Sequence, residues 1–469
     1  MMRALLQILQ VAVLARLLAP ADYGLMAMVT VVLGFAALFA DPGINSAYVQ
    51  RQGVTVEQRS ALFWLNILLS TSVTVFVIVT SPLFASFFGD ARLAPLMMLS
   101  ASTFVLNALG QQVRMSAEKE LNFRPVVLLE ITAALLGFVL SVLAALGGWG
   151  VYSLVVSGIA TALTSTVLAW IFLARGWRPL WRLRLGDVRP FIGFGGALVS
   201  NNIINQINST VDVFFGGRSL AAAQLGFYSV PRNLTLQIQS TVNPIITRVG
   251  FPLIAQVQFD IARVKAIYLK TMNMTASTNA PLYLVVAFFA PELIAILLGT
   301  SWNQSAELLR VLALWGALRS TGNPIGSLAR GMGRPDLELK WNLGLLLVMP
   351  PVMWIGAQSG AMGLAWALLI LQMALFIPAW YVLVRPLCQA GLVEYSISAL
   401  KPFLLAVVAV APSFWVAMRF DGPAVRFAVG LALTAPIYLA ISFKGNRDWF
   451  EAMRNLVGHR RKLNQASLT

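Results

Sequence analysis

The chain of 469 residues is 58% hydrophobic and only 11% charged, a composition that a water-soluble domain of this size could not cover with polar surface. Its net charge of +16 is spread over the breaks between apolar runs and does not gather on one face, which argues against a nucleic-acid partner. A single cysteine and a single histidine exclude a disulfide framework and a metal-ligand cluster of these residues, and no cofactor is expected.

Apolar runs long enough to cross the hydrocarbon core as helices recur along the whole chain, with short polar breaks between them. The sequence therefore predicts an all-α polytopic membrane protein with about 14 transmembrane helices. The first predicted spans are 3-19, 24-48, 62-88, 94-115, 126-146 and 150-174. The later ones are 191-215, 224-250, 266-290, 305-329, 338-356, 360-384, 400-418 and 424-443.

Most lysine and arginine residues fall on one side of the membrane if the amino terminus is cytoplasmic. The positive-inside rule then predicts a multi-pass protein of the cytoplasmic (inner) membrane with both termini in the cytoplasm. The break at 175-190 is the most basic one before the carboxy-terminal tail. We predict that it links two helix bundles and faces anionic lipid, or else docks a diphosphate head group.

An internal repeat is visible at long period. The motif R-x-L-A-x-A-x-x-G begins at Arg16 and again at Arg218, an offset of 202 residues. Asp41-Pro42 matches Asn243-Pro244 at the same offset. The repeat includes the first apolar run, which argues that this run is a spanning helix and not a cleaved secretory signal. It predicts two six-helix parallel-repeat lobes plus two C-terminal helices, with a substrate site between the lobes.

The predicted domains follow from this repeat. They are an N-terminal six-helix lobe (1-174), a basic cytoplasmic linker (175-190), a C-terminal six-helix lobe (191-386), two additional transmembrane helices (387-443) and a basic cytoplasmic tail (444-469).

Several segments resemble one family of transporters. The segments are 14-24 (LARLLAPADYG), 39-45 (FADPGIN), 63-66 (FWLN), 214-228, 252-256 (PLIAQ) and 331-335 (GMGRP). They are similar to the polysaccharide flippases of the multidrug, oligosaccharidyl-lipid and polysaccharide exporter superfamily, in particular to the branch of colanic acid and other exopolysaccharide exporters. The family usually has Asp-Leu-Gly where this chain has Asp41-Pro42-Gly43.

The resemblance implies a secondary-type flippase that moves undecaprenyl-diphosphate-linked oligosaccharide units by alternating access. It implies a lipid-linked oligosaccharide as substrate, contact with membrane lipids, and no ATP hydrolysis. The driving force would be an ion gradient, of protons or sodium, or downstream consumption of the glycan by a polysaccharide polymerase and the export machinery. A phosphate-binding loop is absent from the sequence, and no enzyme activity is expected.

Three alternatives stay open at this stage. A lipid II flippase and a cation-coupled multidrug exporter belong to the same superfamily. A membrane glycan polymerase is the alternative from another class, but it generally needs a sizeable outer loop, which the predicted spans do not leave.

Polar side chains repeat at helical spacing inside several predicted spans, where hydrocarbon makes unpaired polar groups costly. Amide, phenol and hydroxyl groups donate and accept hydrogen bonds at once, which suits sugars, and Arg232 can bind a diphosphate bidentately, with Asp41 or Asp212 as its counter-charge or a proton-coupling site. The alternative is interhelical hydrogen bonding that only holds the halves together. The substrate-cavity candidates are Asp41, Asn45, Asn201, Asn205, Asn208, Asp212, Tyr228, Arg232, Gln239, Asn243 and Arg319.

Overall fold

The computed structural model describes residues 2–181, 184–451 and 454, which contain helices and no strand. Every predicted span coincides with a helix or with helices separated by a break. Within the described residues, eight helices are long and apolar enough to cross a membrane, or ten if each bent pair is one span. The all-α, many-span architecture is thus confirmed, and the count of about 14 spans stays a prediction.

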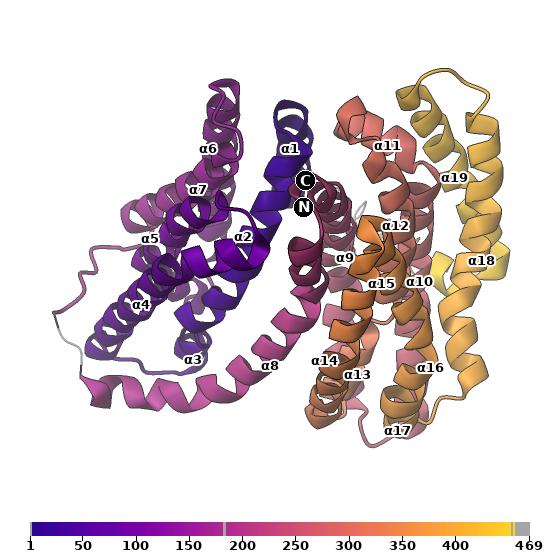
Figure 1. Cartoon of the computed structure of the whole chain (residues 1–469). Helices are drawn as coiled ribbons and strands as arrows, with labels where there is room; N and C mark the ends of the chain where they lie inside the picture. Colours follow the sequence, from indigo (N-terminus) through magenta and orange to yellow (C-terminus); the bar gives the residue numbers. More distant parts are fainter. Residues whose placement is uncertain (1, 182–183, 452–453, 455–469) are drawn as a thin grey trace, which may run out of the picture. The chain divides into compact units, whose positions relative to one another are not determined.

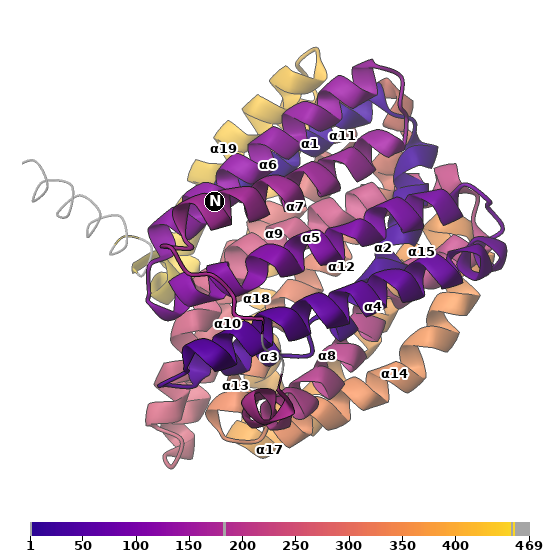
Figure 2. The same ribbon diagram turned by 90° about the vertical axis from the view of Figure 1, so that its left-hand side faces the viewer.

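Packing divides the chain into two compact units. The first comprises Met1–Ser229 and Leu345–Ala361. Within it, α4 lies along α5, α6 along α7, and α8 along α2 (Figures 1 and 2). Its helices are α1 (Met2–Leu17), α2 (Pro20–Ala40), α3 (Ile44–Gln50), α4 (Val56–Phe88), α5 (Leu93–Lys119), α6 (Phe123–Leu146), α7 (Tyr152–Phe172), α8 (Leu185–Ser219) and the start of α9 (Ala222–Gln256).

The second unit comprises Val230–Gly344 and Met362–Thr469. Here α10 packs against α12 and α18, and α18 packs against α19. Besides most of α9, its helices are α10 (Ile261–Phe288), α11 (Ala290–Leu297), η1 (Thr300–Trp302), α12 (Gln304–Thr321), α13 (Pro324–Gly331), α15 (Gly360–Ala374), α16 (Phe376–Ala379), η2 (Trp380–Val384), α17 (Arg385–Cys388), α18 (Leu392–Ala417) and α19 (Pro423–Gly445); α14 (Pro335–Gln358) has residues in both units. The predicted lobes 1-174 and 191-386 stay a prediction.

The predicted single helix over 24-48 is in fact two helices, because the chain breaks between α2 and α3. Proline at position 42 has no N–H to continue the helix. Gly43 caps α3 with a φ of 80°, in the left-handed region that glycine adopts without strain. The predicted span 266-290 also contains a sharp bend, of 77°, near its end between α10 and α11. The break at Asp41-Pro42-Gly43 turns the following residues toward α4 and α5.

Two glycines of the repeated motif are in direct contact inside the first unit. A Cβ atom on Gly24 would overlap the carbonyl oxygen of Ala222, and a Cβ atom on Gly226 would overlap the carbonyl oxygen of Pro20. Because Pro20 and Ala222 are themselves equivalent under the offset of 202, the contact is reciprocal, as it is around a two-fold axis. The starts of α2 and α9 therefore cross at the repeated R-x-L-A-x-A-x-x-G motif.

The basic segment after α7 packs on the start of α4. Trp64 donates its indole N–H to the carbonyl oxygen of Leu180 at 2.8 Å, and Trp181 stacks on the Trp64 ring at 4.3 Å. The Arg59 guanidinium lies 3.9 Å above the Trp177 ring. The predicted linker 175-190 is thus attached to α4 up to residue 181. Residues 182–183, and the predicted tail beyond position 454, lie outside the described residues.

Candidate functional site

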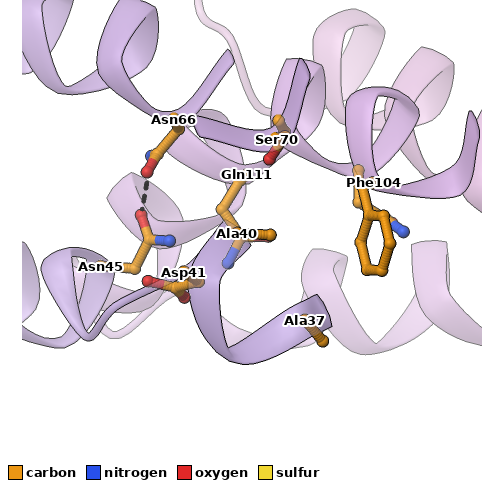
Figure 3. A pocket seen from close by; sticks show the side chains of 10 residues that line it. Ala37, Ala40, Asp41, Asn45, Asn66, Ser70, Phe104 and Gln111 are labelled. Atoms are coloured by element: carbon orange, nitrogen blue, oxygen red, sulfur yellow. Dashed lines mark hydrogen bonds between the residues drawn. The ribbon is translucent and has the colours of Figure 1, made fainter. Parts of the chain in front are cut away.

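A cavity of about 160 Å³ lies inside the first unit, between the α2–α3 break and the facing sides of α4 and α5 (Figure 3). Both α4 and α5 belong to the helices that are long and apolar enough to cross a membrane. The cavity is lined by Ala37, Ala40, Asp41, Asn45, Asn66, Ser70, Phe104, Asn107, Ala108 and Gln111.

Helical spacing explains why these side chains share one space. Asn66 and Ser70 are four residues apart on α4, so they lie on one face of that helix. Phe104, Asn107 and Gln111 follow at intervals of three and four on α5 and form a second face. The break after α2 completes the wall, because it lets α3 enter beside these two helices.

Hydrogen bonds between helices and within α5 hold the amide groups of the cavity in place. Asn66 donates its Nδ2 to Oδ1 of Asn45 at 3.1 Å, and the two side chains are only 2% and 3% exposed. On the opposite wall, Arg114 donates to Oε1 of Gln111 at 3.2 Å and to the carbonyl oxygen of Asn107 at 3.1 Å. Both walls are therefore fixed before any ligand arrives.

The buried Arg114 is supported from a third helix. Its other terminal nitrogen donates to the Ser165 hydroxyl on α7 at 2.8 Å, and the residue is 8% exposed. A buried guanidinium is tolerated when its N–H groups meet acceptors, and here three acceptors are present. Arg114 consequently acts on the cavity through Gln111 and Asn107 and does not line it.

A separate set of contacts fixes α3 against α5. The Tyr48 hydroxyl and the Ser116 hydroxyl are 2.9 Å apart and both are buried. Lys119 closes the end of α3 by donating to the carbonyl oxygens of Tyr48 at 3.2 Å and Arg51 at 2.6 Å. Since Asn45 belongs to the same short helix, these contacts also set its position.

Two of the candidates predicted from the sequence, Asp41 and Asn45, line this cavity. The polar candidates at helical spacing along α8 lie in the same unit. Asn205 is exposed, Asn208 is half-buried, and Asp212 is 1% exposed. Tyr228 donates its hydroxyl to Oδ2 of Asp212 at 2.6 Å, which joins the end of α8 to the start of α9. The side chain of Asn201 lies outside the described residues.

The other candidates belong to the second unit. Arg232 is buried and Gln239 is half-buried on α9, and Arg319 holds its guanidinium 5.3 Å from the Trp315 ring. Asn243 is the centre of a fully buried network. These residues and those of the first unit stay predicted members of one substrate cavity.

The Asn243 network ties three helices of the second unit together. Its Nδ2 donates to the carbonyl oxygen of Ser320 at 3.1 Å. Its Oδ1 accepts from Asn279 at 2.8 Å and from the Ser320 hydroxyl at 3.0 Å. Asn279 and Ser320 are both 0% exposed. This geometry matches the interhelical hydrogen bonding that the sequence left open as an alternative.

Sequence reasoning missed most of the cavity wall. Asn66, Ser70, Asn107 and Gln111 were not among the candidates, nor was the supporting Arg114. Their spacing along α4 and α5 follows the same helical periodicity as the polar candidates on α8. Polar pairs at i, i+3 and i+4 in those two predicted spans therefore identify them.

The arrangement can bind but has no reactive constellation. The wall presents four side-chain amides, one hydroxyl, one carboxylate and one aromatic ring, according to its lining residues. Amides and hydroxyls are simultaneous donors and acceptors, which is the chemistry that recognises polyhydroxylated ligands.

Comparison with known proteins places this geometry in a family context. A family model described as polysaccharide biosynthesis protein matches residues 13–307. The lipopolysaccharide biosynthesis protein WzxC of Escherichia coli K12 is 30% identical over 419 residues, covering 89% of this chain and 85% of the relative. The teichuronic acid biosynthesis protein TuaB of Bacillus subtilis 168 is 28% identical and covers 94% and 92%.

Solved structures show the same fold at low identity. The lipid II flippase MurJ in an inward closed conformation superimposes with a TM-score of 0.73 at 12% identity, over 95% of this chain and 97% of that one. An inward-facing multidrug resistance MATE transporter of the MOP superfamily gives a TM-score of 0.61 at 13% identity, over 87% and 95%.

Proposed function

The chain belongs to the polysaccharide biosynthesis protein family, and we propose that it is a flippase for undecaprenyl-diphosphate-linked oligosaccharide units destined for lipopolysaccharide or exopolysaccharide. It is a multi-pass membrane transporter and not an enzyme. A relative that is 23% identical over 379 residues, ExoT of Rhizobium meliloti 1021, is named a succinoglycan biosynthesis transport protein, which supports a transport function. We place the chain in the cytoplasmic membrane with both termini in the cytoplasm.

The observation that supports this proposal is the cavity between α4 and α5, whose lining residues include four with side-chain amides. Polar side chains within membrane-spanning helices are expensive unless they pair or line a path for polar cargo. Here Asn45, Asn66 and Gln111 are aligned by neighbours and still border open space. Such amides can form hydrogen bonds with a hydroxyl-rich glycan while it crosses the membrane.

The lining also weighs against a multidrug exporter. Such a cavity is expected to be aromatic and acidic, as hydrophobic cations require. Only Phe104 and Asp41 among the ten lining residues have those properties. The likeness to the MATE transporter therefore supports a shared fold and not a shared cargo.

We further propose that Arg232 binds the diphosphate of the carrier lipid, with Asp41 or Asp212 as its counter-charge or as the site of proton or sodium coupling. A guanidinium can hold a diphosphate through two parallel N–H groups. Movement of two six-helix lobes would then alternate access, and a polysaccharide polymerase or the export machinery would take up the product.

The direct test is a sidedness assay. Purified protein is reconstituted into liposomes that contain the undecaprenyl-diphosphate-linked repeat unit of its own host, and a membrane-impermeant glycosidase reports which glycans become accessible. Protein-dependent exposure of the inner glycans is expected. Equal exposure in protein-free liposomes contradicts the proposal, and exposure of lipid II in preference to the repeat unit favours the lipid II flippase.

Arg232→Ala tests the head-group role in the same assay. We expect at least a tenfold loss of rate, since removing one charge-assisted contact to phosphate costs about 1.5–3 kcal/mol. Arg419→Ala is the matched control, because Arg419 is exposed and stacks over Trp415 at 4.3 Å. Unchanged transport by Arg232→Ala at normal expression excludes that role.

A further inference from the structure

One side of α4 is apolar and exposed along most of the helix. Its large apolar residues recur at i, i+7, i+11 and i+15, which places them on one side, and they are between 53% and 71% exposed: Leu68, Val75, Val79 and Leu83. Because α4 is long and apolar enough to cross a membrane, this side contacts lipid. Trp64 precedes Leu68 by one helical turn and therefore continues the same side.

The length of α4 does not by itself decide which part of it lies in hydrocarbon. Its 33 residues, Val56–Phe88, extend about 50 Å at about 1.5 Å per residue, whereas the hydrocarbon core is about 30 Å thick. The stretch from Trp64 to Leu83 measures about 28 Å at the same rise per residue, which is close to that thickness. Anchoring residues near the ends of this stretch therefore set the depth of α4.

The segment that follows α7 is held against the Trp64 end of this side. Both main-chain groups of Leu180 bond to side chains of α4, because its N–H donates to the Ser60 hydroxyl at 3.1 Å and its carbonyl oxygen accepts from the Trp64 indole at 2.8 Å. The Trp181 ring stacks on the Trp64 ring at 4.3 Å. Leu180 and Trp181 are nevertheless 44% and 89% exposed. The two indoles thus extend the exposed apolar side of α4.

Positive charges accompany the two indoles. Arg59 lies five residues before Trp64 on α4, and Arg178 lies three residues before Trp181 and is exposed. The stretch 173-181 contains two arginines and no acidic residue, and the other arginine, Arg175, is paired with a glutamate of α5 at 2.8 Å. Indoles are enriched at the headgroup level of a bilayer, and guanidinium groups bind phosphate. The combination has the chemistry of a contact with anionic lipid.

We propose that Trp64 and Trp181 anchor the start of α4 at the headgroup level of the bilayer, and that Arg59 and Arg178 bind the phosphate of an anionic phospholipid there. The anchor sets the depth of α4, and with it the depth of Asn66, in the membrane. In the topology proposed above this is the cytoplasmic leaflet. The proposal holds for any cargo and does not rest on the flippase assignment.

The position of the indoles favours a bilayer phospholipid over the diphosphate of a carrier lipid as the ligand of the basic segment. Trp64 lies on the lipid-facing side of α4, whereas Asn66 and Ser70 are buried on the opposite side, where the candidate cavity is. A ligand held by the two indoles therefore lies outside the helix bundle.

Fluorescence quenching tests the depth of Trp181. The full chain is placed in nanodiscs of phospholipid brominated in the acyl chain near the headgroup, and the Trp181 signal is the difference between the unchanged chain and Trp181→Phe. We expect brominated lipid to quench most of this signal and acrylamide in the water to quench little of it. Trp302→Phe gives the matched control, since Trp302 is 0% exposed and its signal should resist both quenchers. Quenching of Trp181 by acrylamide and not by brominated lipid overturns the anchor.

The same signal tests the phosphate contact at this site alone. Short-chain brominated phosphatidylglycerol or phosphatidylcholine is titrated into the detergent-solubilised chain, and each variant is compared with its own Trp181→Phe partner. Arg59→Gln and Arg178→Gln should each weaken phosphatidylglycerol binding about fivefold, equal to about 1 kcal/mol for one arginine at an anionic surface, and leave phosphatidylcholine binding unchanged. Arg334→Gln is the matched control, because Asp336 holds the Arg334 guanidinium at 2.9 and 3.1 Å.

The outcomes separate the possible ligands. Equal affinity for the two brominated lipids, or equal phosphatidylglycerol affinity in Arg178→Gln and Arg334→Gln, overturns the phospholipid site. Because Arg178 is exposed, this comparison stays decisive if Arg59→Gln fails to fold. Undecaprenyl diphosphate should displace the brominated lipid no better than unbrominated phosphatidylglycerol does. Displacement at about tenfold lower concentration, equal to about 1.4 kcal/mol, overturns the proposal in favour of a carrier-lipid site.

Discussion

Substitution of either glycine in the reciprocal contact should destabilise the first unit by a similar amount. A Cβ on Gly24 or on Gly226 meets a backbone carbonyl of the other helix, which cannot rotate away as a side chain can. Overpacking costs about 1–3 kcal/mol, and a backbone neighbour places the cost near 3. Replacing helical glycine by alanine returns about 1 kcal/mol of conformational entropy. The net expectation is a loss of roughly 2 kcal/mol for each variant.

The double variant distinguishes a shared contact from two independent ones. If the sites were independent, Gly24→Ala with Gly226→Ala would cost about 4 kcal/mol. Once the first alanine has separated α2 from α9, however, the second finds space already open. We therefore expect the double variant to cost little more than either single one, a coupling of about 2 kcal/mol.

The assay is unfolding in mixed micelles, followed by tryptophan fluorescence. Gly158→Ala is the control, because Gly158 lies within α7 and the nearest atom to its Cβ position is 4.0 Å away. This control should be neutral or stabilised by up to about 1 kcal/mol. Single variants as stable as the control, or strictly additive losses, would refute the reasoning.

Two more predictions concern hydrogen bonds. Asn243→Leu should lower the free energy of unfolding by about 2–4 kcal/mol, since it leaves buried groups of Asn279 and Ser320 without their partner, and the same micelle assay measures it. In the loop between α4 and α5, the Arg92 guanidinium holds the pKa of the Asp90 carboxyl below its ordinary value through a 2.7 Å contact. The resulting stability is present above the ordinary pKa of a carboxyl and is lost as the pH falls through the lowered pKa. Arg92→Gln should therefore lower the free energy of unfolding by less than about 1 kcal/mol near about pH 7 for this largely exposed pair, and the difference should shrink as the pH falls below the ordinary carboxyl pKa of about 3.9. A difference that persists in acid contradicts this assignment.

The positions of the helices follow from the sequence, whereas their buried faces do not. Length and apolarity are enough to place α4, because any twenty apolar residues satisfy the bilayer. In water, the buried face of a helix is the apolar one. In lipid, the exposed face of α4 is apolar, and Val79 and Leu83 are 71% and 70% exposed while the polar Asn66 and Ser70 are buried. The apolar residues of α4 therefore give no sign of which side meets α5, and the spacing of its polar residues is the signal that remains.

Part of the candidate site was visible for a different reason. Asp41 and Asn45 were predicted from their helical spacing within one span, whereas the break at Pro42 and Gly43 separates them and is what brings them to the cavity. The contact of Tyr228 with Asp212 was not visible, because it depends on how the chain turns between α8 and α9. The pairing of Arg114 with Gln111 needs a buried cation on an otherwise apolar helix, which composition alone argues against.

The glycine contact also bears on ancestry. If the predicted repeat arose from two copies of one chain that associated as a symmetric dimer, those copies would have touched at this point through the same residues on each partner, and their fusion would have preserved the contact within one polypeptide. Positions away from such an axis would then be free to diverge separately, whereas Gly24 and Gly226 each press on a backbone carbonyl of the other motif. That mutual constraint accounts for a repeat that is legible around Arg16–Gly24 and Arg218–Gly226.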